Sequence, residues 1–520
     1  MKKILIVGGG SAGWMSAATM IRKFPNSEVT VIESPNISTV GVGESTIGGI
    51  RLWTNWLGID DKEFLKFTDG SYKLAIKFTD FYKKDDGGFY YPFGAPDVQG
   101  NHAGLNDWWI KKFHYPETHV SDYATCMYPQ MAYVNENKCD YNTDRAINFK
   151  FKRDTAFHFD ATKFAFWLRD NYCIPRGVKH ILEDVHTVNT SPDGIVSIND
   201  KHSADLYIDC TGFKSLLLAE TLDVPFDSYE DMLPNNKAWA TKIPYTDKEK
   251  QLDTFTNCTA IENGWVWNIP LWSRIGTGYV YSDKFVNDDV ALEEFKRHLE
   301  SNGVNTDNLE YRNISMRVGI HRRLWVKNVV AIGLSAGFIE PLESNGLYTV
   351  HEFLIRLVKN LNREKVSQWD RDTFNYDCRL LFRNFAEFVA MHYSLSHRDD
   401  TEYWKANLNK HWCDDEAINF KADMKNGFGR AMFDRTQQNY FPESGGFGCI
   451  AAGMNWSPID KDETEYMNSH MDDQEQVNAD HNESIIIDRL NRKRDNWKTA
   501  VADKPSLYQF LKENIYNADV

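Results

Sequence analysis

The stretch ILIVGGGSAG at residues 4–13 decides the fold. Its first four residues form a continuous apolar run, which is typical of a strand buried on both faces, and residues 14–24 continue with apolar positions at helical spacing. A second β-branched run, residues 29–32, ends at the acidic residue Glu33. The order strand, glycine turn, helix, strand and acid predicts the start of a Rossmann-like dinucleotide-binding core.

The glycine turn has the residues that binding a dinucleotide requires. Gly8 makes the tight turn, Gly10 lets a pyrophosphate approach the backbone, and Gly13 permits close packing of the helix on the strand. The N-terminus of the helix favours the anion, and Glu33 can accept hydrogen bonds from a ribose hydroxyl. The predicted contacts of this turn are Gly8, Gly9, Gly10, Ala12, Gly13 and Glu33.

Two further buried runs favour FAD over NAD. Residues 204–211 lead into Gly212, and residues 329–332 lead into Gly333, which is followed by Leu334. Three strands that each end in a glycine turn suit an extended cofactor lying across one sheet. The sequence has no second complete G-x-G-x-x-G motif, so we expect another protein to reduce the flavin.

Composition describes an acidic globular protein. The 520 residues carry a formal net charge of −15, with 42% hydrophobic and 26% charged residues. This charge argues against nucleic acid as a partner, and no apolar run approaches the roughly 20 residues that span a bilayer. The eight cysteines are scattered without a CxxC pair, which suits reduced thiols and predicts no metal site. We therefore expect a cytoplasmic enzyme that does not bind membranes, with self-association left open.

Four further motifs identify a family. They are GVGEST at residues 41–46, SYKLAIKF at 71–78, GWVWNIP at 264–270 and FIEPLESNG at 338–346. With them, the chain resembles the flavin-dependent halogenases of the tryptophan halogenase type over nearly its whole length. The resemblance implies an α/β (α+β) fold. A Rossmann-like FAD-binding core of the flavin monooxygenase type would occupy residues 1–350, and a mostly helical substrate-side region residues 351–520.

The resemblance implies a reaction in two separate places. Reduced FAD, supplied by a separate NAD(P)H-dependent flavin reductase, would react with O₂ and with chloride, bromide or iodide to give a hypohalous acid. That acid would travel to Lys77, beside an electron-rich indole- or phenol-type substrate. Glu343 would position it or take the proton from the halogenated ring; Glu340, in the same loop, is its rival. The backbone amides of Asn345 and Gly346 would hold the halide.

The remaining predicted contacts also follow from the resemblance. Trp265, Trp267 and Pro270 are expected to lie near the flavin and to keep substrate away from it. A pair of tryptophans two apart in a strand would also suit ordinary packing on one face. The further residues expected to contact FAD are Gly43, Glu44, Ser45, Thr46, Val185, Gly212, Leu334 and Leu347.

The predicted substrate pocket departs from that of the tryptophan-specific members. Tyr91 and Phe93 take the place of the first aromatic clamp, and residues 440–449, where a second clamp is expected, contain no tryptophan. The glycines of this stretch predict an open loop. Loss of a stacking ring argues against free tryptophan and favours an indole or phenol derivative, which could be larger or peptide-like.

Two other functions remain open at this point. A flavin monooxygenase that hydroxylates its substrate would not need Lys77, but such enzymes usually show Gly-Asp where this chain has Gly333-Leu334. A non-catalytic FAD-binding relative would tolerate the loss of Lys77 and Glu343, yet both residues are present.

Overall fold

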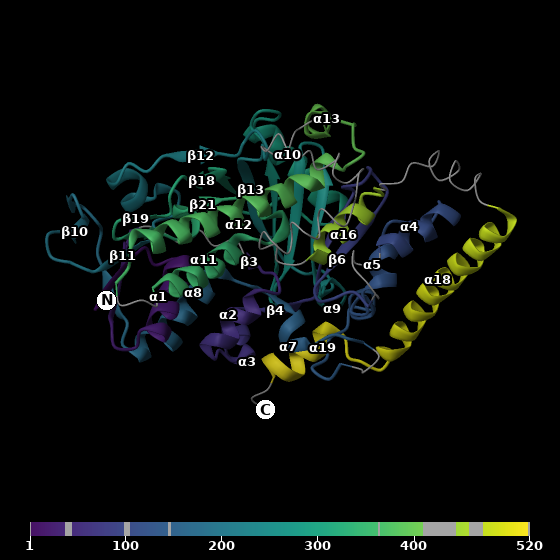
Figure 1. Ribbon diagram of the computed structural model, residues 1–520, viewed down its shortest axis with the longest axis horizontal. Coiled ribbons are helices and arrows are strands. Elements are labelled where there is room, and N and C mark those ends of the chain that lie inside the picture. The colour runs from purple at the N-terminus through teal and green to yellow at the C-terminus, as the bar shows by residue number, and fades with distance from the viewer. Residues whose placement is uncertain are drawn as a thin grey trace.

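The computed structural model describes residues 2–36, 44–97, 105–143, 147–361, 365–408, 444–456 and 472–517 (Figure 1). A six-stranded sheet has β1 (Lys3–Val7) between β2 (Glu28–Glu33) and β11 (Leu206–Asp209). Outside these lie β8 (Lys179–Leu182) and β20 (Val329–Ala331), and all five strands are parallel. The edge strand β19 (Trp325–Val326) is antiparallel to β20. The predicted Rossmann-like core is confirmed.

The second large sheet has seven strands. Its order is β17 (Arg312–Ser315), β13 (Lys237–Ile243), β16 (Ile275–Tyr281), β15 (Gly264–Pro270), β14 (Phe255–Ile261), β5 (Ala75–Thr79) and β6 (Gly88–Pro92). Only the β14–β5 pair is parallel. Helix α10 (Asp288–Ser301) packs on β13 and β16 through a small apolar cluster that includes Tyr279 and Phe295.

A smaller sheet has three strands. It contains β3 (Glu44–Ser45), β7 (Ala156–Phe159) and β4 (Ser71–Lys73), all antiparallel to their neighbours. Leu74 is the single residue between β4 and β5, so the chain changes sheets there. Its amide donates to the carbonyl of Thr254, and its carbonyl accepts from the amide of Phe93.

The part of residues 351–520 that the structure describes is mostly helical, as the sequence predicts. Helices α11 (Gly346–Asn360) and α12 (Gln368–Ser394) pack on each other, and α11 also packs on α1 (Ser11–Lys23) (Figure 1). Helix α18 (Asp473–Ala500) lies beside α4 (Leu105–His114) at one end of the molecule. A boundary between residues 350 and 351 would fall inside α11, and the division into domains stays a prediction.

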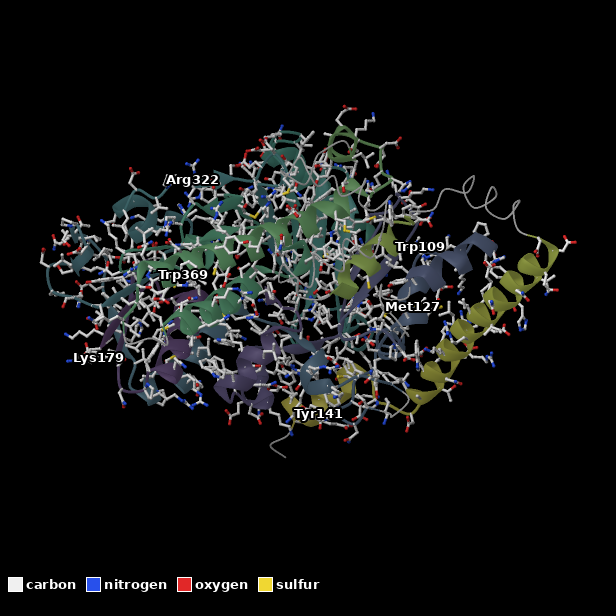
Figure 2. All side chains as sticks on the ribbon, viewed as in Figure 1. Trp109, Met127, Tyr141, Lys179, Arg322 and Trp369 are labelled. Carbon is white, nitrogen blue, oxygen red and sulfur yellow. The ribbon has the colours of Figure 1, made fainter. Side chains whose placement is uncertain are left out.

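The last helix closes the fold over β4. In α19 (Leu507–Leu511), the ring of Phe510 lies 4.7 Å from that of Tyr141, which in turn contacts Tyr72 of β4. Figure 2 shows Tyr141 next to this helix. None of the helices in the described part of the chain combines the length and apolar composition that crossing a bilayer requires.

The remaining helices are α2 (Ile50–Leu57), α3 (Asp61–Phe67), α5 (Asp122–Met127), α6 (Met131–Asn135), α7 (Phe151–Asp154), α8 (Ala161–Trp167), α9 (Lys248–Gln251), α13 (Glu402–Leu408) and α16 (Ser444–Gly453). The 3₁₀-helices are η3 (Ile174–Arg176), η4 (Gly212–Lys214), η6 (Gly333–Ser335) and η7 (Pro341–Glu343), and the π-helices are η2 (Leu168–Cys173), η5 (Leu216–Thr221) and η8 (Lys512–Tyr516). The remaining strands are β9 (Val188–Ser191), β10 (Gly194–Ile198), β12 (Phe226–Ser228), β18 (Gly319–His321) and β21 (Gly337–Phe338).

Candidate active site

The glycine turn after β1 leaves no room for side chains. Gly8 has φ of +112°, and a Cβ there would lie 2.2 Å from the carbonyl oxygen of Cys210. A Cβ on Gly9 would lie 2.1 Å from the carboxyl carbon of Glu33, and one on Gly13 would lie 1.9 Å from the carbonyl oxygen of Gly8. Helix α1 begins after Gly10 without a side-chain cap, so its first amides are available to an anion.

The ends of β11 and β20 meet the same turn. Gly212 follows β11 with φ of +72°, and Gly333 follows β20 with φ of +73°. A Cβ on Gly333 would lie 2.7 Å from the Cβ of Ala12, so the two turns are in close approach. Glycines at the carboxyl ends of three adjacent parallel strands form the backbone cradle that a dinucleotide requires, and the site fits FAD.

The other predicted FAD contacts come from several elements. Ser45 of β3 and Thr46 are buried, Val185 is half-buried after β8, and Leu347 is buried in the first turn of α11. Leu334 is half-buried in η6. Gly43 lies outside the described residues, and for Glu44 the structure describes only the backbone of β3. The FAD roles of all these residues stay predictions.

We expect a Gly13→Ala variant to lose FAD affinity by at least about tenfold. Alanine is ordinarily favoured over glycine inside a helix by about 1 kcal/mol. A lower FAD affinity would therefore not come from a weaker helix, but from the contact of the new side chain with Gly8. Fluorescence titration measures the affinity for FAD, and thermal unfolding without FAD measures the stability of the variant. The control is Gly58→Ala, at a left-handed position with φ of +75° and open space around it, which costs stability by about 1–2 kcal/mol. Unchanged FAD affinity in Gly13→Ala would contradict the assignment.

Lys73, at the end of β4, is completely buried beside the Ser-Asn-Gly turn. Its Nζ donates to Oγ of Ser344 at 2.8 Å and to the carbonyl oxygen of Thr46 at 3.0 Å. The Nζ also lies 5.0 Å from the centre of the Phe93 ring. Burial lowers the pKa of Lys73 to about 7, and the nearby Cys258 and Glu343 oppose this shift. Near neutral pH this lysine therefore exists both as ammonium and as free amine.

The buried lysine makes stability depend on pH. Burial lowers the pKa of Lys73 from 10.5 to about 7, so between these values the unfolded chain binds a proton that the native protein does not. Raising the pH then favours the native state. We expect the free energy of unfolding of the wild type to rise relative to that of Lys73→Met between pH 7 and pH 10. Denaturant titrations of both proteins measure this, and parallel pH dependences would contradict it.

Lys77, the lysine predicted from the sequence, lies elsewhere. It is half-buried in β5, with its Nζ 5.7 Å from the ring centre of Tyr90 and 5.9 Å from that of Phe255. The neighbouring Phe78 packs 4.8 Å from the ring of His392, the hydrogen-bond partner of Glu343. Because successive strand residues point to opposite faces, Lys77 points away from Glu343. The structure brings Lys73, and not Lys77, to the predicted acid.

Glu343 forms a buried pair with His392 of α12. Its Oε1 lies 2.7 Å from Nε2 of His392, and both side chains are at most 1% exposed. Nδ1 of His392 faces the carbonyl oxygens of Phe388 and Val389, which only accept, so Nδ1 carries a hydrogen. The Glu343–His392 contact therefore contains a single proton shared between the two. Oε2 of Glu343 has no hydrogen-bond partner among the described residues.

Glu340, the other candidate acid, makes structural hydrogen bonds. Its Oε2 accepts hydrogen bonds from Asn235, Trp265 and Tyr393 at 2.8–2.9 Å. Burial raises the pKa of both Glu340 and Glu343; the three donors oppose the rise at Glu340, and His392 and Lys73 oppose it at Glu343. Among the described residues, Oε1 of Glu340 and Oε2 of Glu343 both lack a hydrogen-bond partner. The two acids differ in their surroundings, because the charge of Glu343 acts on the pKa of Lys73, whereas the hydrogen bonds of Glu340 hold Trp265 in place.

The predicted halide turn is a tight corner. Ser344 has φ of +57°, and Asn345 precedes the first residue of α11, Gly346. Asn345 is buried; its Nδ2 donates to the carbonyl of Ile339, and its Oδ1 has no partner among the described residues. The amides that begin α11 suit a small anion, since Asn345 makes no side-chain cap. The halide site itself stays a prediction.

The tryptophans of the W-x-W-x-I-P motif lie together on β15. Trp265 and Trp267 have ring centres 6.2 Å apart, and both are buried. A Cβ on Gly278 would lie 2.2 Å from the Trp267 ring, so glycine there makes room for this indole. The carbonyl of Pro270, at the end of β15, accepts from Ser71. These contacts give the motif a packing role beside Glu340.

The predicted pocket residues Tyr91 and Phe93 are buried and pack edge to face, 5.9 Å apart. The prediction of an open loop over residues 440–449 is wrong from Ser444 onward, because α16 begins there; residues 440–443 lie outside the described residues. A Cβ on Gly446 would lie 3.1 Å from Tyr91 and from Phe388. The glycines let a helix, not a loop, pack closely against these rings.

Comparison with known proteins decides the family. The model of the tryptophan halogenase family matches residues 3–469. This chain belongs to the tryptophan halogenase family. The tryptophan 7-halogenase RebH of Lentzea aerocolonigenes is 32% identical over 486 residues, which cover 88% of this chain and 90% of RebH. The tryptophan 6-halogenase ThaL of Streptomyces albogriseolus is 31% identical over 490 residues, with the same coverage of 88% and 90%.

Solved structures of this family have the same fold. The apo structure of VirX1 superimposes with a TM-score of 0.87 at 36% identity and covers 99% of this chain and 100% of its own. The tryptophan 6-halogenase SttH of Streptomyces toxytricini has a TM-score of 0.80 at 29% identity, covering 98% and 100%. As a member of the tryptophan halogenase family, the chain is a flavin-dependent halogenase that acts on an aromatic substrate, and the alternative of a hydroxylase is not favoured.

Proposed function

We propose that this halogenase holds hypohalous acid at Lys73 and delivers its halogen to an electron-rich aromatic substrate. The observation that supports this is the position of the Lys73 Nζ, which is fully buried, bonded to Ser344 and within the field of Glu343. Two of the hydrogen-bonding directions of the Nζ are taken by Ser344 and Thr46. No described residue takes the third, which is available for hypohalous acid.

Lys73 has the acid–base properties that this role requires. With a pKa of about 7, it can donate a hydrogen bond as ammonium or attack halogen as a free amine at neutral pH. Attack would form an N–X bond, break the X–OH bond and release hydroxide, which takes the amine proton to give water. In either form the lysine replaces water as the partner of a reactive species and holds it away from solvent.

Glu343 is proposed as the base that completes the substitution. Addition of halogen to an aromatic ring leaves a cationic ring that must lose a proton. Oε2 of Glu343, which has no hydrogen-bond partner in the part of the chain that the structure describes, can accept it. His392 keeps the other oxygen in place through the single shared proton. The carboxylate is thereby aimed by one oxygen and reactive at the other.

The residues that would hold FAD and the halide are separate from those of the proposed substrate pocket. Bound reduced FAD, together with O₂, supplies the two-electron oxidation that converts halide to hypohalous acid. The glycine turns at Gly8, Gly212 and Gly333 would hold the dinucleotide, and the amides at Asn345 and Gly346 would hold the halide. A separate NAD(P)H-dependent reductase is proposed to supply the reduced flavin.

The proposed substrate is an indole- or phenol-type aromatic, rather than free tryptophan. Phe93 faces Lys73. Beyond it, the rings of Tyr91, Phe388 and Phe447 pack together and form what we call the aromatic wall. Edge-to-face rings of this kind bind a flat electron-rich ring without a charged clamp. Larger derivatives of the same ring system remain within the proposal.

The test combines the purified protein with FAD, a flavin reductase, NADH and a panel of indoles and phenols, with chloride or bromide. We expect mass spectrometry to show the halogen isotope pattern only when a halide, O₂ and reduced flavin are all present. A product heavier by one oxygen atom, without halogen, would instead support hydroxylation. The absence of product across the whole panel, with FAD bound, would support the non-catalytic alternative.

A further inference from the structure

A buried chain of hydroxyl groups connects Lys73 to His158. We call it the hydroxyl chain, and it consists of Ser344, Ser45 and Thr256. The Nζ of Lys73 lies 2.8 Å from Ser344, the next two oxygen–oxygen distances are 3.0 and 2.6 Å, and Thr256 lies 2.9 Å from Nε2 of His158. Every member is at most 6% exposed.

The direction of every hydrogen bond in the hydroxyl chain follows from its far end. Ser71 donates its only hydroxyl hydrogen to the carbonyl of Pro270 at 2.8 Å, because a proline carbonyl can only accept. Ser71 must therefore accept from Nδ1 of His158, 3.2 Å away. Nδ1 then carries the hydrogen of a neutral imidazole, and Nε2 is the acceptor. Burial and the charge of Lys73 lower the pKa of His158 well below its usual range, which keeps the ring neutral.

The directions of the remaining hydrogen bonds, from Thr256 to Lys73, follow in the same way. Thr256 has one hydrogen and gives it to His158, so it accepts from Ser45. Ser45 has then used its hydrogen and accepts from Ser344. Ser344 in turn has none left and can only accept from Lys73. All the bonds point from Lys73 toward His158.

We propose that His158, through the hydroxyl chain, orients the lone pair of Lys73 toward the hypohalous acid. Ser344 cannot donate to the free amine while its hydrogen points to Ser45. The lone pair of the neutral lysine is therefore left free on the side that faces Phe93. This rests on the proposed role of Lys73 and makes His158 a positioning residue, which acts without touching the reactants.

Reversal of the hydroxyl chain would occupy the lone pair. If Nε2 of His158 carried a hydrogen, Thr256, Ser45 and Ser344 could all turn round, and Ser344 would donate to the amine of Lys73. The other groups that act on the lysine are Glu343, paired with His392, and the buried thiol of Cys258. Neither belongs to the hydroxyl chain, so its direction depends on His158 and Ser71.

The test interrupts the hydroxyl chain at its centre with Thr256→Val, which keeps the shape of the side chain. Ser344 is then free to donate to the amine, so we expect kcat for halogenation to fall about tenfold, a loss on the scale of one hydrogen bond. Because that new bond favours the uncharged lysine, we also expect the pH at which kcat rises, near 7, to move lower. FAD affinity should be unchanged. Thr256→Ser, which retains the hydroxyl, should restore both the rate and the pH profile.

The matched control is Thr277→Val in β16. Thr277 is buried to 1% exposure, and its hydroxyl has no hydrogen-bond partner among the described residues, so its removal should change neither rate nor pH profile. A lower rate in Thr256→Val without a shifted pH profile, or a wild-type rate and profile, would overturn the inference. If Lys73→Met itself halogenates like the wild type, the proposed role of Lys73 fails instead.

Discussion

A Lys73→Met variant is expected to lose halogenation by at least about a thousandfold while still binding FAD. Methionine fills a similar unbranched volume but offers neither the hydrogen bond nor the amine that hypohalous acid requires. The variant should also fold well, because it removes a buried basic group whose pKa is lowered to about 7. Single-turnover formation of halogenated product measures the loss. A thiol scavenger in solution removes hypohalous acid that has escaped from the protein.

Lys77→Met is the matched comparison. The same substitution four residues along removes a half-buried lysine that lies over Tyr90 and Phe255. We expect its rate to stay within a few-fold of the wild type, with a modest loss of stability from those ring contacts. The opposite pair of results, an active Lys73→Met and an inactive Lys77→Met, would restore the assignment made from the sequence.

A Glu343→Gln variant is expected to lose about a hundredfold or more in kcat, the usual contribution of a positioned base. The amide cannot take the ring proton, and its carbonyl or amino group faces His392 in place of the shared proton. Loss of the ring proton should then limit the rate. A substrate deuterated at the halogenated carbon should therefore react more slowly in Glu343→Gln, and with little isotope effect in the wild type.

Glu340→Gln provides the control for this prediction. Glu340 accepts three hydrogen bonds at one oxygen, and a glutamine carbonyl can accept the same three. We expect a few-fold change in rate at most and no isotope effect. A loss in Glu340→Gln equal to that in Glu343→Gln, with the isotope effect on the Glu340 variant, would exchange the roles of the two acids.

The sequence predicts the FAD-binding part of the molecule well, because local patterns determine it. The glycine turn, β1, α1, β2, β11 and β20 all appear where the apolar runs and glycines place them. Contacts such as that between Gly13 and Gly8 are the reason for these residues, and they are close in sequence. The sequence pattern is therefore enough to predict the geometry of the glycine turn and of the elements around it.

The choice of lysine depends on information that is not local. In one continuous strand, residues 73 and 77 would share a face, and both have apolar neighbours. The chain instead changes sheets at Leu74, which is held by backbone bonds to Thr254 and Phe93. The partners that set this break are distant in sequence. The hydroxyl chain cannot be predicted from the sequence either, since its three members come from three separate segments.

The helix α16 was missed for a different reason. Its residues include several glycines, which disfavour a helix when taken alone. Packing decides the outcome, because a side chain on Gly453 would collide with Phe89 and one on Gly446 would be tightly packed against Tyr91 and Phe388. Close approach to aromatic rings favours the helix over the local preference for a turn.

The hydroxyl chain takes no residue from β6, α12 or α16, the elements that form the aromatic wall around Tyr91. Substitutions accumulating in that wall can therefore alter which molecule is accepted while the hydrogen bonds from Lys73 through the hydroxyl chain are inherited unchanged. Divergence among descendants of such a protein would be expected to concentrate on one side of the lysine. A library restricted to the wall could then search for new substrates without first having to recover the chemistry.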